Sequence, residues 1–219
     1  MQYMQNSTRT GLRERKKAAT RLAIEEAAVE IACTQGYELA TAEAIAEKAN
    51  VSLRTFFNYF PSKDLAIMGR SRASISGERA LQILTETGGD LLKGIAGIAA
   101  ACVAETDPTS QLMRRRRRLV HENPALFHLH VTADLQFDAW LVGVVAEHLK
   151  ASPSQRRLGD EATVEAEARL AVTVVSSAVH HLVRQAIEED VDAVIDAEDI
   201  ERTIDMMAKI HAGAGRDRT

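Results

Sequence analysis

The chain has 219 residues, of which 46% are apolar and 4% aromatic, and its formal net charge is −4. This length and apolar fraction are sufficient for one large or two modest domains with a buried core, and they exclude a disordered chain as the default. Strong helix formers dominate and only 4 prolines interrupt them. We therefore expect an all-α fold of about nine or ten helices.

The charge is distributed unevenly. The first part of the chain has a basic excess, and the segment over 188–205 has an acidic one opposed by Arg202 alone. The two cysteines, Cys33 and Cys102, are far apart and form no CxxC motif, so we expect both to be small buried residues in a reducing cytoplasm. We take 94–104 as the longest apolar stretch, and it is too short to span a bilayer. The sequence therefore predicts a soluble cytoplasmic protein without a membrane partner.

Three helices are expected within the first 60 residues, because apolar residues recur there at helical spacing between capping residues. They are a helix over 12–35 that ends at Gly36, a short helix capped by Thr41 that runs through Ala49, and a short helix capped by Ser52 that ends near Phe60. Asn50 tolerates the left-handed conformation needed between the second and third. Two short helices that follow a longer one across a tight turn predict a trihelical helix-turn-helix.

The rest of the chain predicts a larger bundle of about six helices. A fourth helix is expected from the capping residue Ser62 to about Leu84. Three breaks then divide the chain, namely Gly88 with Gly89, Asp107 with Pro108, and Asn123 with Pro124. Five further helices are predicted. The first ends near Glu105, the next three cover 108–121, 124–150 and 161–188, and the last is capped by Asp196 and ended by Gly213.

The stretch over 41–64, TAEAIAEKANVSLRTFFNYFPSKD, closely resembles the helix-turn-helix core of TetR-family regulators, and the segment TRLAIEEAAVEIACTQGYE before it resembles their first helix. Asn50 stands where the family usually has Gly, and Phe57 where Tyr is commoner. The resemblance implies a DNA-binding domain over 1–65 and a ligand-binding and dimerisation domain over 66–219. It also implies a homodimer held by the last two long helices, with double-stranded operator DNA as partner.

The spacing on the third helix independently predicts a DNA-reading face. Phe56 and Phe60 lie four residues apart, so they share a face that we expect to point inward. Arg54 and Asn58 then face outward with Phe57 between them, and they can pair with guanine and adenine in the major groove. Each such pair discriminates by roughly 1 to 3 kcal/mol.

Further DNA contacts follow from the resemblance and from the basic start of the chain. The resemblance implies that Thr55, Tyr59 and Lys63 contact phosphates, which position a protein without reading sequence. The basic arm, which contains Arg13, Arg15, Lys16 and Lys17, is expected to lie along phosphates or to enter the minor groove. The alternative is that it is simply an exposed helix start. The predicted DNA-binding set is Arg13, Arg15, Lys16, Lys17, Thr41, Ser52, Leu53, Arg54, Thr55, Phe57, Asn58, Tyr59 and Lys63.

Five consecutive arginines over 114–118 cannot all face water on one helix, because successive residues are rotated by about 100°. Inward arginines either receive an anionic ligand or form a structural ion-pair cluster with carboxylates such as Glu122 or Asp134. This helix and the residues that follow Asn123 resemble the TetR branch of mycofactocin-type, acyl-CoA-responsive regulators, which implies an anionic or acyl effector. The predicted effector-binding residues are Met113, Arg117, Phe137 and Trp140.

The histidines do not have metal-ligand spacing, because His128 and His130 diverge on a helix and His121 lies across the Asn123 break. No metal site, catalytic residue or cofactor is therefore predicted. Small residues on the helix over 161–188 permit close helix approach. The predicted dimer-interface residues there are Leu170, Val174, Ala178, His181 and Leu182.

Together these patterns predict a ligand-responsive transcriptional regulator, a repressor that binds a palindromic operator as a dimer and is released by a small-molecule effector. The alternatives are an all-α ligand carrier or enzyme without a transcriptional role, and a helical adaptor that retains a helix-turn-helix. The sequence disfavours the enzyme, because it has no phosphate-binding loop, no metal-ligand spacing and no nucleophile beside a base.

Overall fold

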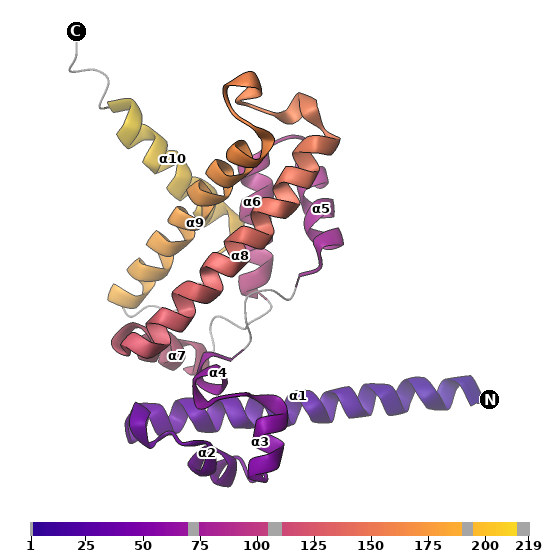
Figure 1. The fold of residues 1–219 in the computed structure, drawn as a ribbon, viewed down its shortest axis with the longest axis vertical. Helices are drawn as coiled ribbons and strands as arrows, with labels where there is room; N and C mark the ends of the chain where they lie inside the picture. Colours follow the sequence, from indigo (N-terminus) through magenta and orange to yellow (C-terminus); the bar gives the residue numbers. More distant parts are fainter. Residues whose placement is uncertain (1, 70–74, 105–110, 190–194, 214–219) are drawn as a thin grey trace. The chain divides into compact units, whose positions relative to one another are not determined.

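The computed structural model describes residues 2–69, 75–104, 111–189 and 195–213, and these form ten α-helices and three short 3₁₀ helices (Figure 1). No strand occurs in these ranges, so the all-α prediction is confirmed. The α-helices are α1 (Gln2–Thr34), α2 (Ala42–Lys48), α3 (Leu53–Tyr59), α4 (Lys63–Met68), α5 (Gly77–Glu86), α6 (Leu91–Ala104), α7 (Gln111–Glu122), α8 (Pro124–Ala151), α9 (Val164–Glu188) and α10 (Ala197–Gly213). The 3₁₀ helices are η1 (Tyr37–Leu39), η2 (Pro153–Gln155) and η3 (Gly159–Glu161).

The chain divides into two compact units, which are described separately. The first comprises Met1–Arg70 and Gln111–His130, and the second comprises Ser71–Ser110 and Val131–Thr219. The helix α7 and the start of α8 thus belong with the N-terminal helices, although they follow them by 40 residues or more in the sequence. The functional boundary after residue 65 stays a prediction.

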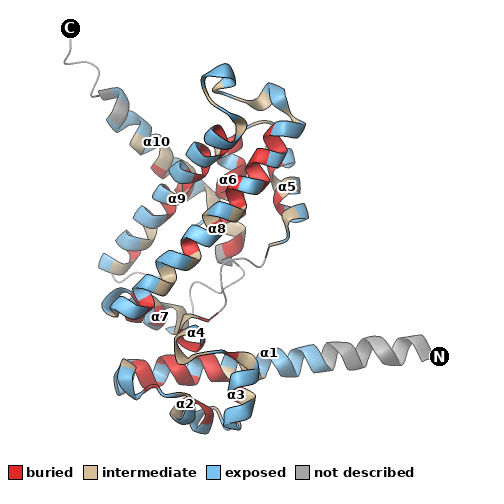
Figure 2. Cartoon of the chain, in the orientation of Figure 1, coloured by how far each residue is buried: buried red, intermediate tan, exposed pale blue. Residues whose placement is uncertain are grey.

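The first unit is built on the second half of α1. Figure 2 shows burial on α1 in this half, and the residues from 13 to 19 before it are exposed. Ile24 and Ala28 of α1 share one core with buried residues of the other helices of this unit. These include Ile45 of α2, Phe56 of α3, Ile67 of α4, Leu119 of α7 and Leu126 of α8.

Helix ends occur largely where the capping residues predict them. The Asn123 Oδ1 atom accepts the backbone N–H groups of Ala125 and Leu126 at 3.0 and 3.2 Å, which satisfies donors that the first turn of α8 leaves free. The Asp196 Oδ1 atom accepts the N–H of Asp199 at 2.9 Å at the start of α10. The predicted cap at Asp107 and Pro108 lies outside the described residues.

Two predicted helices differ in length from those in the structure. The first was expected over 12–35, but α1 begins at Gln2. The fourth helix was expected to continue from Ser62 to about Leu84, but α4 ends at Met68, and α5 begins only at Gly77 after the capping residue Ser76. The cause is Gly69, whose φ of 74° is a conformation that residues with a Cβ atom rarely adopt. A helix therefore stops there even though helix formers follow.

The second unit is organised around α6, which packs against α5, α9 and α10. Gly94 lets α5 approach closely, because a Cβ atom at this position would lie 2.8 Å from Cδ2 of Leu84. From α8 this core takes Leu141, Val145 and Leu149, all of which are fully buried. The result is a helical bundle in which every long helix contributes to one apolar core.

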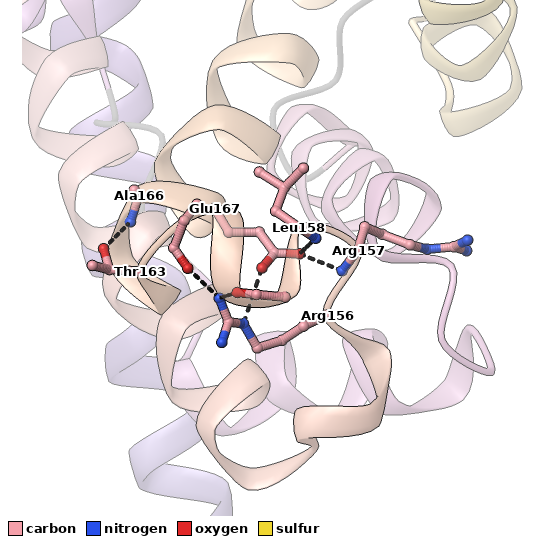
Figure 3. A network of polar contacts seen from close by, with 8 residues as sticks. Arg156, Arg157, Leu158, Thr163, Ala166 and Glu167 are labelled. Atoms are coloured by element: carbon pink, nitrogen blue, oxygen red, sulfur yellow. Dashed lines mark hydrogen bonds and ion pairs between the residues drawn. The ribbon is translucent and has the colours of Figure 1, made fainter.

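A buried carboxylate holds the loop between α8 and α9 (Figure 3). Glu167 on α9 accepts the backbone N–H groups of Arg157 and Leu158, and its Oε2 atom lies 3.0 Å from Nε of Arg156. The same guanidinium donates to the carbonyl oxygens of Gly159 and Ala162. Burial alone would raise the pKa of Glu167, but these donors outweigh it and the pKa is lowered.

The cysteine prediction is half correct. Cys102 is buried in the second core, but Cys33 is exposed, because it follows the last buried turn of α1 on the side away from Ile31 and Ala32. Helix α9 is long and apolar enough to cross a membrane by length and composition. Its Val172, Val175 and Val179 side chains are buried in the second core, and such core helices meet the same criterion.

Candidate nucleic-acid interface

Helices α2 and α3 form the helix-turn-helix that the sequence predicts. The Thr41 side chain accepts the N–H of Ala44 at 3.2 Å and starts α2, and the Ser52 side chain accepts the N–H of Thr55 at 3.0 Å and starts α3. Between them Asn50 has φ 53°, the left-handed conformation expected there. The turn is therefore determined by three short polar side chains.

Helix α3 has one buried face and one exposed face. Phe56 and Phe60 are 0% and 1% exposed, and their ring centroids lie 6.3 Å apart inside the first core. Arg54 and Asn58 are exposed, and Phe57, which packs edge-on against Phe56, is 52% exposed. As expected, the side chains of Phe56 and Phe60 point inward and the other three point outward.

Two of the remaining predicted residues of α3 are less exposed to solvent. Thr55 and Tyr59 are half-buried, and Leu53 is exposed at the first turn. The Thr55 hydroxyl also shares a hydrogen bond of 2.8 Å with the Ser52 hydroxyl. Arg54, Phe57 and Asn58 therefore lie on the exposed face of α3, where direct reading of bases stays a prediction, and Thr55 and Tyr59 lie at its border.

The structure gives Lys63 a partner that the sequence did not reveal. Its Nζ atom donates to the carbonyl oxygen of Tyr37 at 3.0 Å and lies 4.0 Å from the centroid of the Tyr37 ring. Glu38 Oε2 is 4.0 Å away. The ammonium group is thus engaged between η1 and α4, so a phosphate contact by Lys63 would have to compete with this arrangement.

Tyr37 also reaches the first turn of α4 through its hydroxyl, which donates to Oδ1 of Asp64 at 2.6 Å. Burial, the hydrogen bond to Asp64 and the nearby carboxylate charges raise the pKa of Tyr37 to about 12. Tyr37 and Lys63 therefore make reciprocal contacts that fix α4 against the end of α1. The sequence analysis did not assign this role to Tyr37, because the partners Lys63 and Asp64 are 26 and 27 residues away.

The predicted basic arm is part of a helix. Arg13, Arg15, Lys16 and Lys17 all lie on α1 and all are exposed. Residues 13 and 17 are four apart and so lie on the same face of α1. The arm therefore presents its charges from a helical surface.

The arginine run on α7 contributes a buried ion pair to this unit. Arg116 is 8% exposed, and its Nη2 atom lies 3.0 Å from Oε2 of Glu25 on α1. Burial lowers the pKa of Arg116, and the Glu25 carboxylate opposes that effect. The inward arginine is as expected, but its partner is Glu25 and not Glu122 or Asp134.

The predicted effector residues fall in different units. Met113 and Arg117 are half-buried on α7 in the first unit, and the Met113 sulfur accepts from Arg116 at 3.2 Å. Phe137 and Trp140 lie on α8 in the second unit with ring centroids 5.5 Å apart. Phe137 and Trp140 therefore form a pair of neighbouring rings. Beside it is a small cavity of about 20 Å³, lined by Ala99, Cys102, Phe137, Leu141, Val175, Ser176 and Val179.

The predicted dimer residues of α9 also separate into two groups. Leu170, Val174 and His181 are exposed on one face of the helix, and Leu182 is half-buried. Ala178 is fully buried in the core of its own unit, so the structure does not offer it to a second subunit. The physical reason is its helical position, which points it toward the same core as Val175 and Val179.

The histidines make individual polar contacts. His148 Nε2 lies 2.7 Å from Oε1 of Gln155, and His180 Nε2 lies 3.1 Å from Oδ2 of Asp134. Within the described ranges, no group of three or more His, Cys, Asp or Glu side chains has a metal-binding arrangement. The expectation of no metal and no cofactor stays a prediction.

A trihelical unit with a capped two-helix turn and an exposed polar face on its second short helix is a helix-turn-helix unit of the DNA-binding class. Residues 24–65 match the family model for bacterial regulatory proteins of the tetR family. The segment that carries the helix-turn-helix is thus similar to the tetR family. That match ends within α4, at the fourth helix of the first unit.

Two curated relatives are transcriptional regulators. The chain is 28% identical over 142 residues to the HTH-type transcriptional regulator TcmR of Streptomyces glaucescens, covering 62% of this chain and 63% of that protein. It is 27% identical over 125 residues to the uncharacterized HTH-type transcriptional regulator YvkB of Bacillus subtilis, covering 57% of this chain and 63% of that protein. The matches thus span less than two thirds of either relative. Both relatives are named as regulators rather than enzymes, in agreement with the prediction that the chain is not an enzyme.

A solved structure has the same fold. The fatty acid degradation regulator FadR of Bacillus halodurans superposes with a TM-score of 0.50 at 16% identity, and covers 84% of this chain and 95% of that one. At this identity the likeness concerns the fold alone. It agrees with the arrangement of an N-terminal helix-turn-helix followed by a larger helical part, which the sequence predicts.

Proposed function

We propose that a dimer of this chain is a cytoplasmic, ligand-responsive transcriptional repressor that binds a palindromic operator through α3. The observation that carries the proposal is the division of α3 into two faces. Phe56 and Phe60 anchor it from behind, and Arg54, Phe57 and Asn58 are left exposed. A recognition helix needs this division, because one face must enter the major groove while the other is held by the unit.

The exposed side chains match base edges in kind. Arg54 suits the two acceptors of guanine, and Asn58 suits the donor and acceptor of adenine. Phe57 lacks a hydroxyl and offers an apolar contact, such as one with a thymine methyl group. The exposed cations of α1 add contacts to phosphates that hold the protein without reading the sequence.

A second subunit is proposed to pack on the exposed apolar face of α9 and α10. Leu170 is 56% exposed and Val174 37% exposed on α9, and Met206 and Ile210 are exposed on α10, which packs beside α9. Apolar side chains at this spacing on adjacent helices are typical of helix pairs that bury each other. A dimer with two-fold symmetry would present two recognition helices to successive major grooves, about 34 Å apart.

The effector is proposed to bind in the second unit beside Phe137 and Trp140. The cavity there is lined mostly by apolar side chains of α6, α8 and α9, with Ser176 as a polar exception, which favours an apolar ligand portion. At about 20 Å³ it has room for about one water molecule, so a larger effector must widen it. An acyl effector, and the branch of acyl-CoA-responsive regulators, stay predictions, and so do contacts from Met113 and Arg117.

The test starts with selection of duplexes from a randomised pool by the purified full chain. Affinity for an enriched duplex and for an unrelated one is then measured over a range of salt concentrations. Arg54→Ala should abolish the preference for the enriched duplex, because the lost contact reads a base. Lys17→Ala should weaken binding to both duplexes and reduce the salt slope by about one.

Arg79→Ala is the matched control, because this exposed arginine lies on α5 in the second unit. Its binding should equal that of the wild type. Failure of the wild-type chain to enrich any duplex would contradict the proposal and favour a ligand carrier or an enzyme. Enrichment that survives Arg54→Ala unchanged would show that α3 is not the reading helix.

A further inference from the structure

Arg116 differs from its neighbours in the arginine run. Arg114, Arg115 and Arg118 are exposed on α7, whereas Arg116 is buried and points to the end of α4. Its Nε atom donates to the carbonyl oxygen of Ile67 at 2.6 Å. This carbonyl lies in the last turn of α4, where the helix leaves its acceptors without internal partners.

The chain leaves space for this side chain at Gly69. A Cβ atom on Gly69 would lie 2.5 Å from Cζ of Arg116, closer than any real contact of this kind. The positive φ of Gly69 and the absence of its side chain thus admit the guanidinium against the end of α4. Both the positive φ of Gly69 and its lack of a Cβ atom are needed for the guanidinium to occupy this position.

Arg116 is also connected to α3 through two residues of α1, Glu25 and Arg21. Glu25 places Oε2 on Arg116 and Oε1 on Nε of Arg21, at 3.0 and 3.1 Å. The Arg21 guanidinium lies 4.5 Å from the centroid of the Phe60 ring. Phe60 is the residue at which α3 ends, so a continuous series of contacts connects α7, α1 and α3 within the first unit.

We infer that Arg116 is a positioning residue for operator recognition, which holds α4 through Ile67 and holds the end of α3 through Glu25, Arg21 and Phe60. The inference rests on the proposed DNA-binding function. Arg116 itself is buried and does not touch DNA in this arrangement. Its loss should therefore disturb the angle of the reading face without removing any base or phosphate contact.

The experiment compares Arg116→Met, which keeps much of the apolar side chain, with Arg116→Lys, which keeps the charge but not the forked geometry. Affinity is measured for the duplex enriched by the wild-type chain and for an unrelated duplex, at a temperature where circular dichroism shows each variant to be folded. Arg116→Met should weaken specific binding at least tenfold and change nonspecific binding less than twofold. Arg116→Lys should recover part of the loss.

Arg115→Met is the matched control, because it removes a neighbouring exposed arginine from the same helix and should leave the ratio of specific to nonspecific affinity unchanged. A purely structural role for Arg116 predicts a lower melting temperature with that ratio intact. If Arg116→Met does not fold, Arg21→Met tests the same series of contacts at a half-exposed residue, and it should lower specific binding with an unaltered salt slope.

The outcomes separate the two proposals. A wild-type chain that enriches no duplex contradicts the proposed function. The positioning role is overturned if the wild-type chain enriches a duplex and folded Arg116→Met has an unchanged ratio of specific to nonspecific affinity. The same conclusion follows if this ratio is unchanged in both Arg116→Lys and Arg21→Met. Either result leaves the DNA-binding function intact.

Discussion

Arg21 on α1 lies over the ring of Phe60, with its Cζ atom 4.5 Å from the ring centroid. Phe60 is 1% exposed and packs with Phe56, so the cation contacts one of the two aromatic rings that anchor α3. A guanidinium over an aromatic face is attracted by the ring quadrupole and also seals the ring from water. The position of the exposed face of α3 therefore depends on the contact between Arg21 and Phe60.

Phe56 and Phe57 are adjacent but should respond oppositely to truncation. Phe56→Ala empties a fully buried site and should destabilise the first unit by about 3 to 5 kcal/mol. Phe57→Ala removes a half-exposed ring and should change stability by no more than about 0.5 kcal/mol while weakening operator binding. Urea unfolding and DNA titration of both variants measure this. Equal destabilisation by the two substitutions would contradict the assigned faces of α3.

Gly69→Ala should be costly for two reasons, its φ of 74° and the clash with Arg116. The backbone strain alone is about 1 to 3 kcal/mol. Gly143→Ala is the control, because Gly143 lies exposed within α8 and an added Cβ there meets no atom within 4 Å. It should stabilise the chain by about 0.5 to 1 kcal/mol. Calorimetry should show melting temperatures that move in opposite directions.

Glu167→Gln should destabilise the second unit in a pH-dependent way. The folded state lowers the pKa of Glu167 below its ordinary value of 4.5, so the unfolded chain binds more protons in that range. The stabilisation is therefore present above pH 4.5 and is lost as the pH falls through the lower folded pKa. The difference in unfolding free energy between wild type and variant should be largest at neutral pH and should shrink below pH 4.5.

Glu165→Gln provides the matched comparison two residues earlier. Glu165 is exposed and pairs with Lys150 at 2.7 Å, a surface contact that water and salt screen. We expect little change in stability at neutral pH and a strong effect of salt on what change there is. A loss as large as that of Glu167→Gln would show that burial is not the source of the effect.

Tyr37→Phe should alter the alkaline limit of stability. The folded state raises the pKa of Tyr37 from 10 to about 12, so the contribution of its hydroxyl is complete below pH 10 and is lost as the pH rises toward 12. Wild type should lose stability between these values more steeply than the variant. Parallel pH profiles of the two proteins would mean that the hydroxyl bond to Asp64 is not formed in solution.

Leu170→Arg tests the proposed dimer face. Leu170 is 56% exposed on α9, and a charge there should oppose burial against a second subunit. Light scattering after gel filtration should show a shift from dimer to monomer. Leu135→Arg is the control, since Leu135 is 64% exposed on α8, outside the proposed interface. A dimer that survives Leu170→Arg but not Leu135→Arg would move the interface to α8.

Local signals were enough for much of this fold. Thr41, Ser52, Asn123 and Asp196 begin helices because their side chains reach backbone N–H groups two or three residues away. Asn50 permits its turn for an equally local reason. The inward side of α3 followed from the spacing of Phe56 and Phe60. Such features depend on near neighbours, so one sequence contains them.

Features set by distant partners were not predictable. Glu25 and Arg116 are 91 residues apart, and nothing in the spacing of either points to the other. The engagement of Lys63 also depends on Tyr37, 26 residues earlier. The exposure of Cys33 likewise depends on which side of α1 the other helices cover. Periodicity alone does not contain this information.

Because Gln111–His130 belongs to the first unit, a fragment that stops near residue 70 would lack part of the core of that unit. It would retain Glu25 and Ile67 but lose the arginine that both of them contact, and it would uncover apolar surface that Leu119 and Leu126 normally shield. Anyone grafting this DNA-binding head onto another sensor should therefore carry over two separate segments of the chain.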